Sequence, residues 1–357
     1  MKRETWNLLT RFLAGVGASL ILVGVLAQLP QKNPRDNVYT RASNIRSDAA
    51  LLTVDGEKVT AEEYLYYVAQ SGLNYRYMLS YSGAGDSVDW DMPLDETGTV
   101  TLRDSVLAQA RQAVVQNAVI RRMAKDADIT PTQTELDSFR QQLDQLRAQY
   151  GDDFRQVLKQ YGLTETLWET LYTTSCLALH LQEAYVSGAL RPDDAALTEL
   201  VADHGLAMAR SLFVSTAYMD ETGVAKAKAD AQGYQKRILA AEDPAAELAA
   251  INTELGVAEE ENTASVYHCG HEGETDAVCL ALKDLQVGEL SALVETDEGF
   301  YLLLRQEMDM DTVAKVQFSE DLEEAMAAAQ VRESKNMARV DVGAFVESMM
   351  TELSAQG

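Results

Sequence analysis

An uncharged run near the N-terminus decides in which compartment the rest of the chain folds. Residues 12–29, FLAGVGASLILVGVLAQL, carry no charged side chain. A helix needs about 20 apolar residues to cross the hydrocarbon layer of a membrane, and this run approaches that length. Lys2, Arg3 and Arg11 precede it, and basic residues favour the cytoplasmic side. The sequence predicts a single-pass protein of the cytoplasmic membrane, with the N-terminus inside and the domains outside.

Residues 1–30 have a second interpretation, as a signal segment that is removed. Val25 and Ala27 form a small-residue pattern that allows cleavage before Gln28, which would release a secreted protein. Both alternatives, membrane anchor and signal segment, place the later residues outside the cytoplasm. Residues 31–50 are polar and show no apolar periodicity, so they are expected to form a linker without a core.

The acidity of the chain excludes one class of partner. The chain has 56 Asp and Glu side chains against 30 Lys and Arg, which gives a formal net charge of -26. Such a surface repels phosphate groups, so nucleic acid is not an expected partner. No P-loop, dinucleotide-binding, zinc-protease or nucleophile-triad pattern occurs in the sequence, and no cofactor is expected.

Residues 51–205 have the pattern of a helical module. A short apolar stretch around the turn Asp55-Gly56 leads into a capping box, Thr60-x-x-Glu63, which predicts the start of a helix. A second capping box, Thr132-x-x-Glu135, predicts a helix with one apolar face. That face consists of residues spaced by three and four, namely Leu136, Phe139, Leu143, Leu146 and Tyr150. Gly151 and Gly162 are expected to end helices.

Residues 206–307 change to a mixture of strands and helices. Strand-like runs at 206–216, 264–267, 290–295 and 300–306 are separated by helical stretches at 221–241, 245–255 and 277–285. The predicted order is β-α-α-β-α-β-β. Residues 308–357 return to helical spacing, and because an amphipathic helix needs a partner face, they are expected to pack on the helical module. The predicted fold class is α+β.

These segments resemble a known family. VDGEKVTAEEYLYYV and ITPTQTELDSFRQQLDQLRAQYGDDFRQVLKQYGLTETLWETL are similar to the N-terminal chaperone segment of the SurA and PrsA group of extracytoplasmic foldases. LKDLQVGELSALVETDEGFYLLLRQE, residues 282–307, resembles the final helix, "GE-S" turn and closing hairpin of a parvulin-type prolyl isomerase domain. The resemblance implies a SurA/PrsA-like chaperone domain at 51–205, an inserted parvulin-like domain at 206–307, and C-terminal helices at 308–357 that complete the chaperone domain.

The sequence departs from the family at the two histidines that parvulin domains carry. The matching positions are Ser211, in SLFV, and Tyr301, in GFYLL, and the family's glycine-rich strand is replaced by TASVYHCG. Neither side chain reproduces an imidazole, which exchanges a proton near neutral pH. Isomerase activity is therefore expected to be weak or absent. Phe213, Leu282 and Phe300 are the candidate contacts for a client polypeptide.

Three cysteines leave more than one possibility open. Cys269 and Cys279 can form a disulfide in an oxidising exterior, with Cys176 on a helix remaining a thiol. His268, Cys269, His271 and Cys279 lie close in sequence and could instead hold a zinc ion, although the H-C-x-H spacing is unlike common zinc sites. Free thiols are the third alternative.

The sequence thus predicts a membrane-tethered chaperone that binds unfolded or partly folded exported polypeptides. Exposed apolar grooves would hold clients while the acidic surface keeps the chain soluble. An active peptidyl-prolyl isomerase is one alternative, and acceleration of proline-limited refolding would single it out. A dedicated membrane-anchored assembly factor is the other, and it would copurify with one partner.

Overall fold

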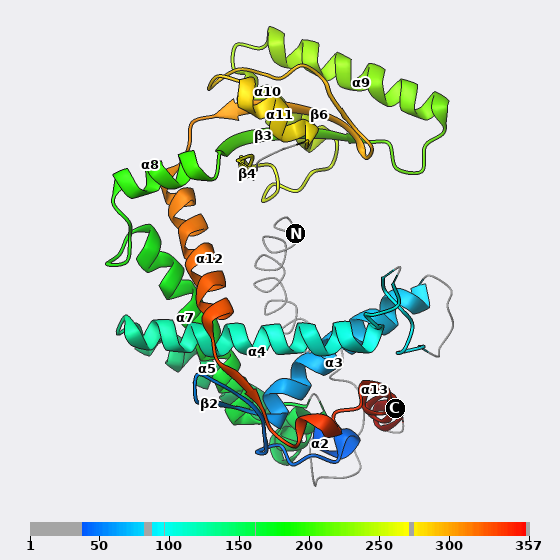
Figure 1. The fold of residues 1–357 in the computed structure, drawn as a ribbon, viewed down its shortest axis with the longest axis vertical. Helices are drawn as coiled ribbons and strands as arrows, with labels where there is room; N and C mark the ends of the chain where they lie inside the picture. The colour runs from blue at the N-terminus through cyan, green and yellow to red at the C-terminus, as the bar shows by residue number, and fades with distance from the viewer. Residues whose placement is uncertain (1–37, 82–87, 96, 161, 271–274, 355–357) are drawn as a thin grey trace. The chain divides into compact units, whose positions relative to one another are not determined.

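The chain forms two compact units. The computed structural model describes residues 38–81, 88–95, 97–160, 162–270 and 275–354, so the predicted membrane segment lies outside the described residues. Unit 1 comprises Met1–Gln182 and Glu320–Gly357, and unit 2 comprises Glu183–Ser319. Figure 1 shows the elements of both units. A search of the described helices finds none that is long and apolar enough to cross a membrane.

Unit 1 is mainly helical, with one small sheet. Its sheet has the antiparallel order β2-β1-β7, formed by β1 (Ala50–Val54), β2 (Glu57–Thr60) and β7 (Val331–Glu333). Its helices are α2 (Val38–Ser43), α3 (Ala61–Tyr81), α4 (Leu102–Asp126), α5 (Gln133–Tyr150), α6 (Phe154–Gln160) and α13 (Val342–Ser354), with the 3-10 turns η1 (Gly151–Asp153) and η2 (Met337–Arg339). The chain passes between the units within α7 (Glu165–Val186) and within α12 (Met310–Ala328).

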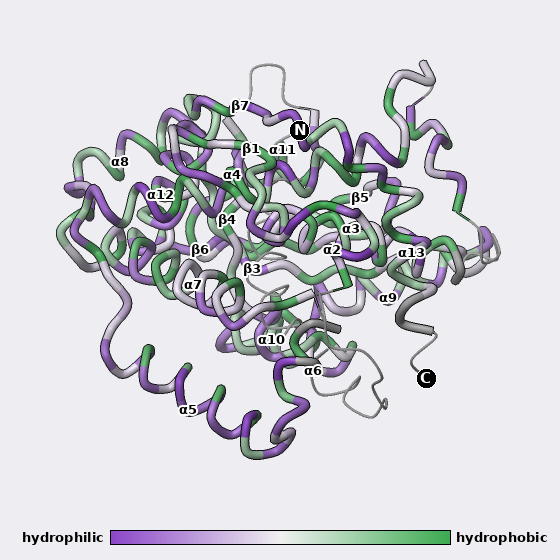
Figure 2. Tube along the Cα trace, turned by 90° about the horizontal axis from the view of Figure 1, so that it is seen from below, coloured by the Kyte–Doolittle hydropathy of each residue, from purple (hydrophilic) through white to green (hydrophobic). Residues whose placement is uncertain are grey.

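Helix α5 confirms the predicted capping box and apolar face. The Thr132 side chain accepts from the Glu135 N–H, and the Glu135 carboxylate accepts from the Thr132 N–H at 2.7 Å. Phe139 and Leu143 are buried, whereas most of the helix is exposed and hydrophilic (Figure 2). The Phe139 ring stacks on Tyr172 of α7, with centroids 4.9 Å apart. The apolar face therefore holds α5 on α7 through a few aromatic contacts.

The linker prediction is wrong for residues 38–50. Val38, Tyr39 and Ile45 are buried, and the Tyr39 ring lies 5.8 Å from the Phe345 ring of α13. Gly162 has a φ of +67°, and a Cβ added there would overlap the Tyr39 ring. These few apolar side chains show no period in the sequence, and only contacts with distant segments bury them.

The C-terminal segment also differs from its prediction as helix alone. Residues 331–333 form β7, which pairs with β1 so that Thr53 lies opposite Arg332. Ser334 strengthens this junction, because its N–H donates to Leu51 O at 2.8 Å and its hydroxyl donates to Ala50 O. A strand of three residues is too short to show a period of two. Helix α13 packs on α2, α3 and α4, so the C-terminal residues contribute to the core of unit 1.

Unit 2 has the predicted order of strands and helices around a four-stranded antiparallel sheet with the order β4-β3-β6-β5. The strands are β3 (Leu206–Ser215), β4 (Ser265–His268), β5 (Val294–Thr296) and β6 (Gly299–Gln306). The helices are α8 (Asp194–Asp203), α9 (Glu221–Ala240), α10 (Pro244–Glu254) and α11 (Ala277–Asp284). Helices α9 and α10 cover one face of the sheet, where Leu212 and Leu302 are buried, and α11 packs on the other face.

Unit 2 extends beyond the predicted limits of 206 and 307. Leu197 and Leu200 of α8 pack with Val313 and Val316 of α12, and Leu206 at the start of β3 joins the same cluster. Arg191 and Asp311 form an ion pair at 2.8 Å beside this cluster. The first part of α12 therefore belongs to the core of unit 2, although its helical spacing had assigned it to the C-terminal helices.

Candidate functional site

Alternation along β3 and β6 places the two histidine-equivalent positions on one face of the unit 2 sheet. Successive side chains of a strand point to opposite faces. Ser211 lies opposite Leu303, and Phe213 lies opposite Tyr301, in the register of the two strands. Ser211 and Tyr301 are therefore diagonal neighbours on the face that α11 partly covers, where such pairs lie about 7–8 Å apart between Cα atoms.

An aromatic pair forms the accessible part of this face. The rings of Phe213 and Tyr301 stack with centroids 4.4 Å apart and planes inclined by 28°. Phe213 remains 37% exposed. Beside them, Leu303 and Val294 are buried in the cluster under α11. A flat aromatic pair at the margin of a buried cluster can contact apolar side chains of a bound polypeptide.

Two of the three candidate client contacts are wrong. Leu282 of α11 is buried in the cluster with Val278 and Leu303, and Phe300 is buried on the opposite face with Ala227 and Ala231. A fully buried side chain cannot touch a ligand without unfolding its surroundings. Phe300 differs from its neighbour Tyr301 because the alternation of β6 sends it toward α9. Only Phe213 keeps the accessibility that a client contact needs.

The chemistry of this face is that of hydroxyl and apolar groups. Serine and tyrosine hydroxyls donate and accept hydrogen bonds but do not exchange protons near neutral pH as imidazole does. The buried amide of Asn252 on α10 donates to Ser211 O at 2.9 Å and so binds the backbone. Ser211 and Tyr301 can form hydrogen bonds, but they do not act as an imidazole acid or base does.

A disulfide lies in the buried cluster beside this site. Cys269, directly after β4, is joined to Cys279 of α11, with Cα atoms 5.0 Å apart. Both residues are buried in the cluster that holds Leu303. Because both sulfurs are joined, neither is a thiolate ligand in this structure, and His271 of the alternative zinc cluster lies outside the described residues. Cys176 is a buried thiol on α7.

The Cys269–Cys279 bridge stays a prediction for the protein in its own compartment. Protein alkylated under denaturing conditions without reductant is expected to be modified at Cys176 only, because the bridged sulfurs do not react. Mass spectrometry of the peptides measures this, and prior reduction, which should expose all three cysteines, is the control. Modification of all three cysteines without reduction would show that the bridge is absent, and zinc binding would again be a possible interpretation.

Comparison with known proteins gives structural neighbours only. No family model and no curated protein matches the chain. Among solved structures, the chain is similar to PrsA of Bacillus subtilis, with 19% identity and a TM-score of 0.28 over 73% of this chain and 91% of that chain. It is also similar to the foldase PrsA of Streptococcus pneumoniae, with 15% identity and a TM-score of 0.22 over 74% and 93% of the two chains.

A third similar structure is described as a SurA-like chaperone of Campylobacter jejuni, with 12% identity and a TM-score of 0.22 over 80% of this chain and 99% of that chain. The neighbours thus belong to the PrsA and SurA-like group that the sequence motifs resemble.

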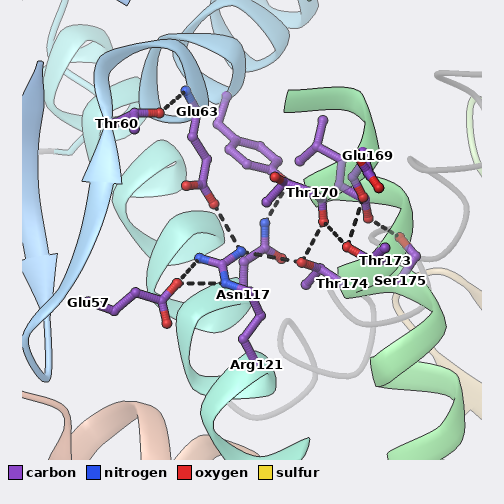
Figure 3. Close-up of polar contacts among 12 residues, drawn as sticks. Glu57, Thr60, Glu63, Asn117, Arg121, Glu169, Thr170, Thr173, Thr174 and Ser175 are labelled. Carbon is purple, nitrogen blue, oxygen red and sulfur yellow. Dashed lines mark hydrogen bonds and ion pairs between the residues drawn. The ribbon is translucent and has the colours of Figure 1, made fainter. Parts of the chain in front are cut away.

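Unit 1 contains a largely buried polar cluster, centred on Arg121 of α4 (Figure 3). Its Nε donates to Glu57 of β2 at 2.6 Å, and its Nη1 donates to Glu63 of α3 at 3.2 Å and to Thr174 of α7 at 3.3 Å. The side chains of Arg121 and Glu63 are only 18% and 6% exposed. Burial raises the pKa of Glu63, which Arg121 opposes by stabilising the carboxylate.

This cluster holds four elements together and does not form an open site. Each polar group of Arg121 is directed at a partner on another element, as Figure 3 shows. The guanidinium donates charge-assisted hydrogen bonds to both carboxylates, and such bonds are stronger than those between neutral groups. The sequence does not predict this cluster, because its members lie on four separate elements and no spacing relates them. The capping-box residue Glu63 gave the only signal, and that signal indicated a helix start.

Proposed function

We propose that this chain is an extracytoplasmic, membrane-tethered chaperone that binds unfolded exported polypeptides, and that its inserted parvulin-like domain has weak or no isomerase activity. The proposal is supported by exposed apolar side chains on a strongly acidic chain. Tyr77 and Met78 near the end of α3, and Leu94 and Val100 in the segment that follows, are all exposed. Exposed apolar groups bind unfolded polypeptides, while a net charge of -26 opposes self-association.

The weak isomerase activity is supported by the residues on the sheet of unit 2. Ser211 and Tyr301 stand on one face, at the positions where the resemblance implies histidines, and no imidazole has taken their place on the described part of β3 or β6. A clear acceleration of proline-limited refolding that Tyr301→Phe removes would contradict this part of the proposal.

The location outside the cytoplasm is supported by the uncharged run at 12–29 and its basic flank. A Cys269–Cys279 bridge in protein taken directly from cells would agree with it, since disulfides persist in oxidising compartments. Protease added to cells stripped of their wall should digest both units. Complete protection of both units would contradict export.

The binding surface of unit 1 is tested by the pair of substitutions Tyr77→Ser and Met78→Ser. The double variant is expected to need about threefold more protein than the wild type to suppress aggregation of a denatured client by half, because it loses apolar contact area. Light scattering during dilution of the client from denaturant measures this. Leu239→Ser on α9 is the matched control, because Leu239 and Tyr77 are both 66% exposed. Equal suppression by the double variant would exclude this surface.

A further inference from the structure

Strand β3 is paired along most of its length on one side and along less than half of it on the other. It has ten residues, and β6 lies opposite Met208–Ser215. On its other side, β4 has four residues and pairs only with Leu206–Ala209. From Arg210 onward, this side of β3 has no strand beside it among the residues that the structure describes.

At Ser211, on this open side, a side chain takes the place of a neighbouring strand as the hydrogen-bond donor. Asn252 Nδ2 donates to Ser211 O at 2.9 Å and to Asn262 Oδ1 at 3.1 Å. Arg210 Nη1 donates to Asn262 O at 2.7 Å. The segment that leads into β4 is thus fastened at Arg210 and Ser211. Beyond Ser211, no described residue takes over the role of a neighbouring strand.

Two residues of β3 present backbone groups on the open side. Backbone N–H and C=O groups of a strand alternate between its two sides. Ala207 and Ala209 pair with β4, and Ser211 O also points to that side, so the groups of Phe213 and Ser215 point there as well. Because β4 pairs only with Leu206–Ala209, the N–H and C=O groups of Phe213 and Ser215 face no strand of the described residues on this side, and Ser215 is exposed.

Acidic side chains lie at one end of this open edge. Glu259, Glu260 and Glu261 are exposed in the turn directly before Asn262, which is fastened to Arg210. At the other end of β3, Thr216 N donates to Glu298 O at 3.0 Å on the side of β6, so the exposed turn of Asp297 and Glu298 does not line the open edge. The edge therefore favours a segment with basic residues at the end that lies beside Glu259–Glu261.

We propose that Phe213–Ser215 of β3 binds an extended segment of a client polypeptide by strand addition, with an apolar or aromatic residue over the Phe213–Tyr301 pair and Lys or Arg residues toward the end beside Glu259–Glu261. This rests on the proposed chaperone function and adds the conformation and charge of the segment that is recognised. Backbone hydrogen bonds make the contact independent of most of the client sequence. An edge of three residues forms few bonds, so clients exchange rapidly.

The test uses the full chain and three synthetic peptides of about ten residues, the length of a long strand. The peptides share one sequence, with a central Phe and alternating Lys on the opposite face. One has an unmodified backbone, and the other two are N-methylated at alternate residues in opposite phases. In an added strand only one phase of N–H groups faces the protein. For a strand added antiparallel, as in every pair of this sheet, the side-chain alternation fixes that phase, because a slip by one residue would turn Lys toward the aromatic pair.

The unmodified peptide and one methylated peptide are expected to bind alike, and the other methylated peptide about tenfold more weakly, because it loses one or two hydrogen bonds. Fluorescence anisotropy of labelled peptides measures this. Equal binding of both methylated peptides, or no binding of the unmodified one, would overturn strand addition. Failure of the full chain to suppress client aggregation would instead count against the proposed function, so the two failures can be told apart.

A second arm changes the protein. Ser215→Pro removes the N–H that points to the open side and leaves the bonds to β6 intact, since proline is tolerated at such edge positions. It is expected to weaken binding of the unmodified peptide about tenfold, whereas Ser215→Thr keeps both the N–H and the hydroxyl and should bind as the wild type does. Wild-type affinity of Ser215→Pro would contradict the proposal. If Ser215→Pro does not fold, the methylated peptides still test strand addition on the wild-type protein.

Discussion

Replacing Tyr39 by alanine is expected to lower the free energy of unfolding of unit 1 by about 3–5 kcal/mol, the cost of deleting a large aromatic side chain from a core. Tyr39 is buried, packs beside Phe345, and fills the space that the missing Cβ of Gly162 leaves open. Urea unfolding followed by tryptophan fluorescence measures the change. Trp90 and Trp168 belong to unit 1, and unit 2 contains no tryptophan, so the signal reports on unit 1.

Tyr39→Phe is the matched control for this change. It keeps the ring against Phe345 and Gly162 and removes only the hydroxyl, so stability should change by less than about 1 kcal/mol. If Tyr39→Ala were as stable as the wild type, residues 38–45 would be the linker that the sequence predicted. The large loss expected instead would make this segment part of the core. The predicted linker of residues 31–50 would then be shorter than the sequence indicated.

Arg121→Met should be equally damaging, at about 3–5 kcal/mol, because it leaves the buried Glu63 carboxylate without its cation. The same fluorescence assay measures it. Arg140→Met is the control, since Arg140 is exposed in an ion pair with Asp137 on the surface of α5, where such pairs contribute little. A loss below about 1 kcal/mol for Arg121→Met would show that the cluster does not stabilise unit 1.

The loss in Arg121→Met should depend on pH with a defined sign. Burial raises the pKa of Glu63 in the folded chain above its ordinary value, and removing Arg121 removes the opposing interaction. A carboxyl whose pKa is higher in the folded state favours folding below its unfolded pKa, and this contribution is lost as pH rises through the folded pKa. The variant should therefore be closest to wild type in acid. Adding Glu63→Gln should recover part of the stability at neutral pH by removing the unpaired charge.

Local signals in the sequence were sufficient for most helices and strands. The capping box at Thr132 and the apolar spacing from Leu136 to Tyr150 predicted α5, because both signals depend on residues within a few positions of one another. The order of elements in unit 2 was predicted for the same reason. Alternation within β3 and β6 then placed Ser211 and Tyr301 on one face once their pairing was known.

Side-chain accessibility was predicted less well, because it depends on what packs against each face. Phe300 and Tyr301 are adjacent and both aromatic, yet one is buried under α9 and the other pairs with Phe213 at the margin of the sheet. Leu282 lies on the apolar face of α11, and this face packs against the sheet. Neither difference can be derived from composition, since each requires the position of a covering helix.

By itself, the sequence determined the α+β class, the order of the elements in unit 2, the acidic charge and the presence of Ser211 and Tyr301 at the positions where the resemblance implies histidines. Only the tertiary structure decided that residues 38–45 enter the core, that residues 331–333 pair with β1, and that Arg121 joins four elements. It also decided that β4 begins only at Ser265, opposite Ala209, and leaves the second half of β3 open. Helix and strand signals repeat over a few residues, whereas these features depend on contacts between segments far apart in the chain, whose register no local period records.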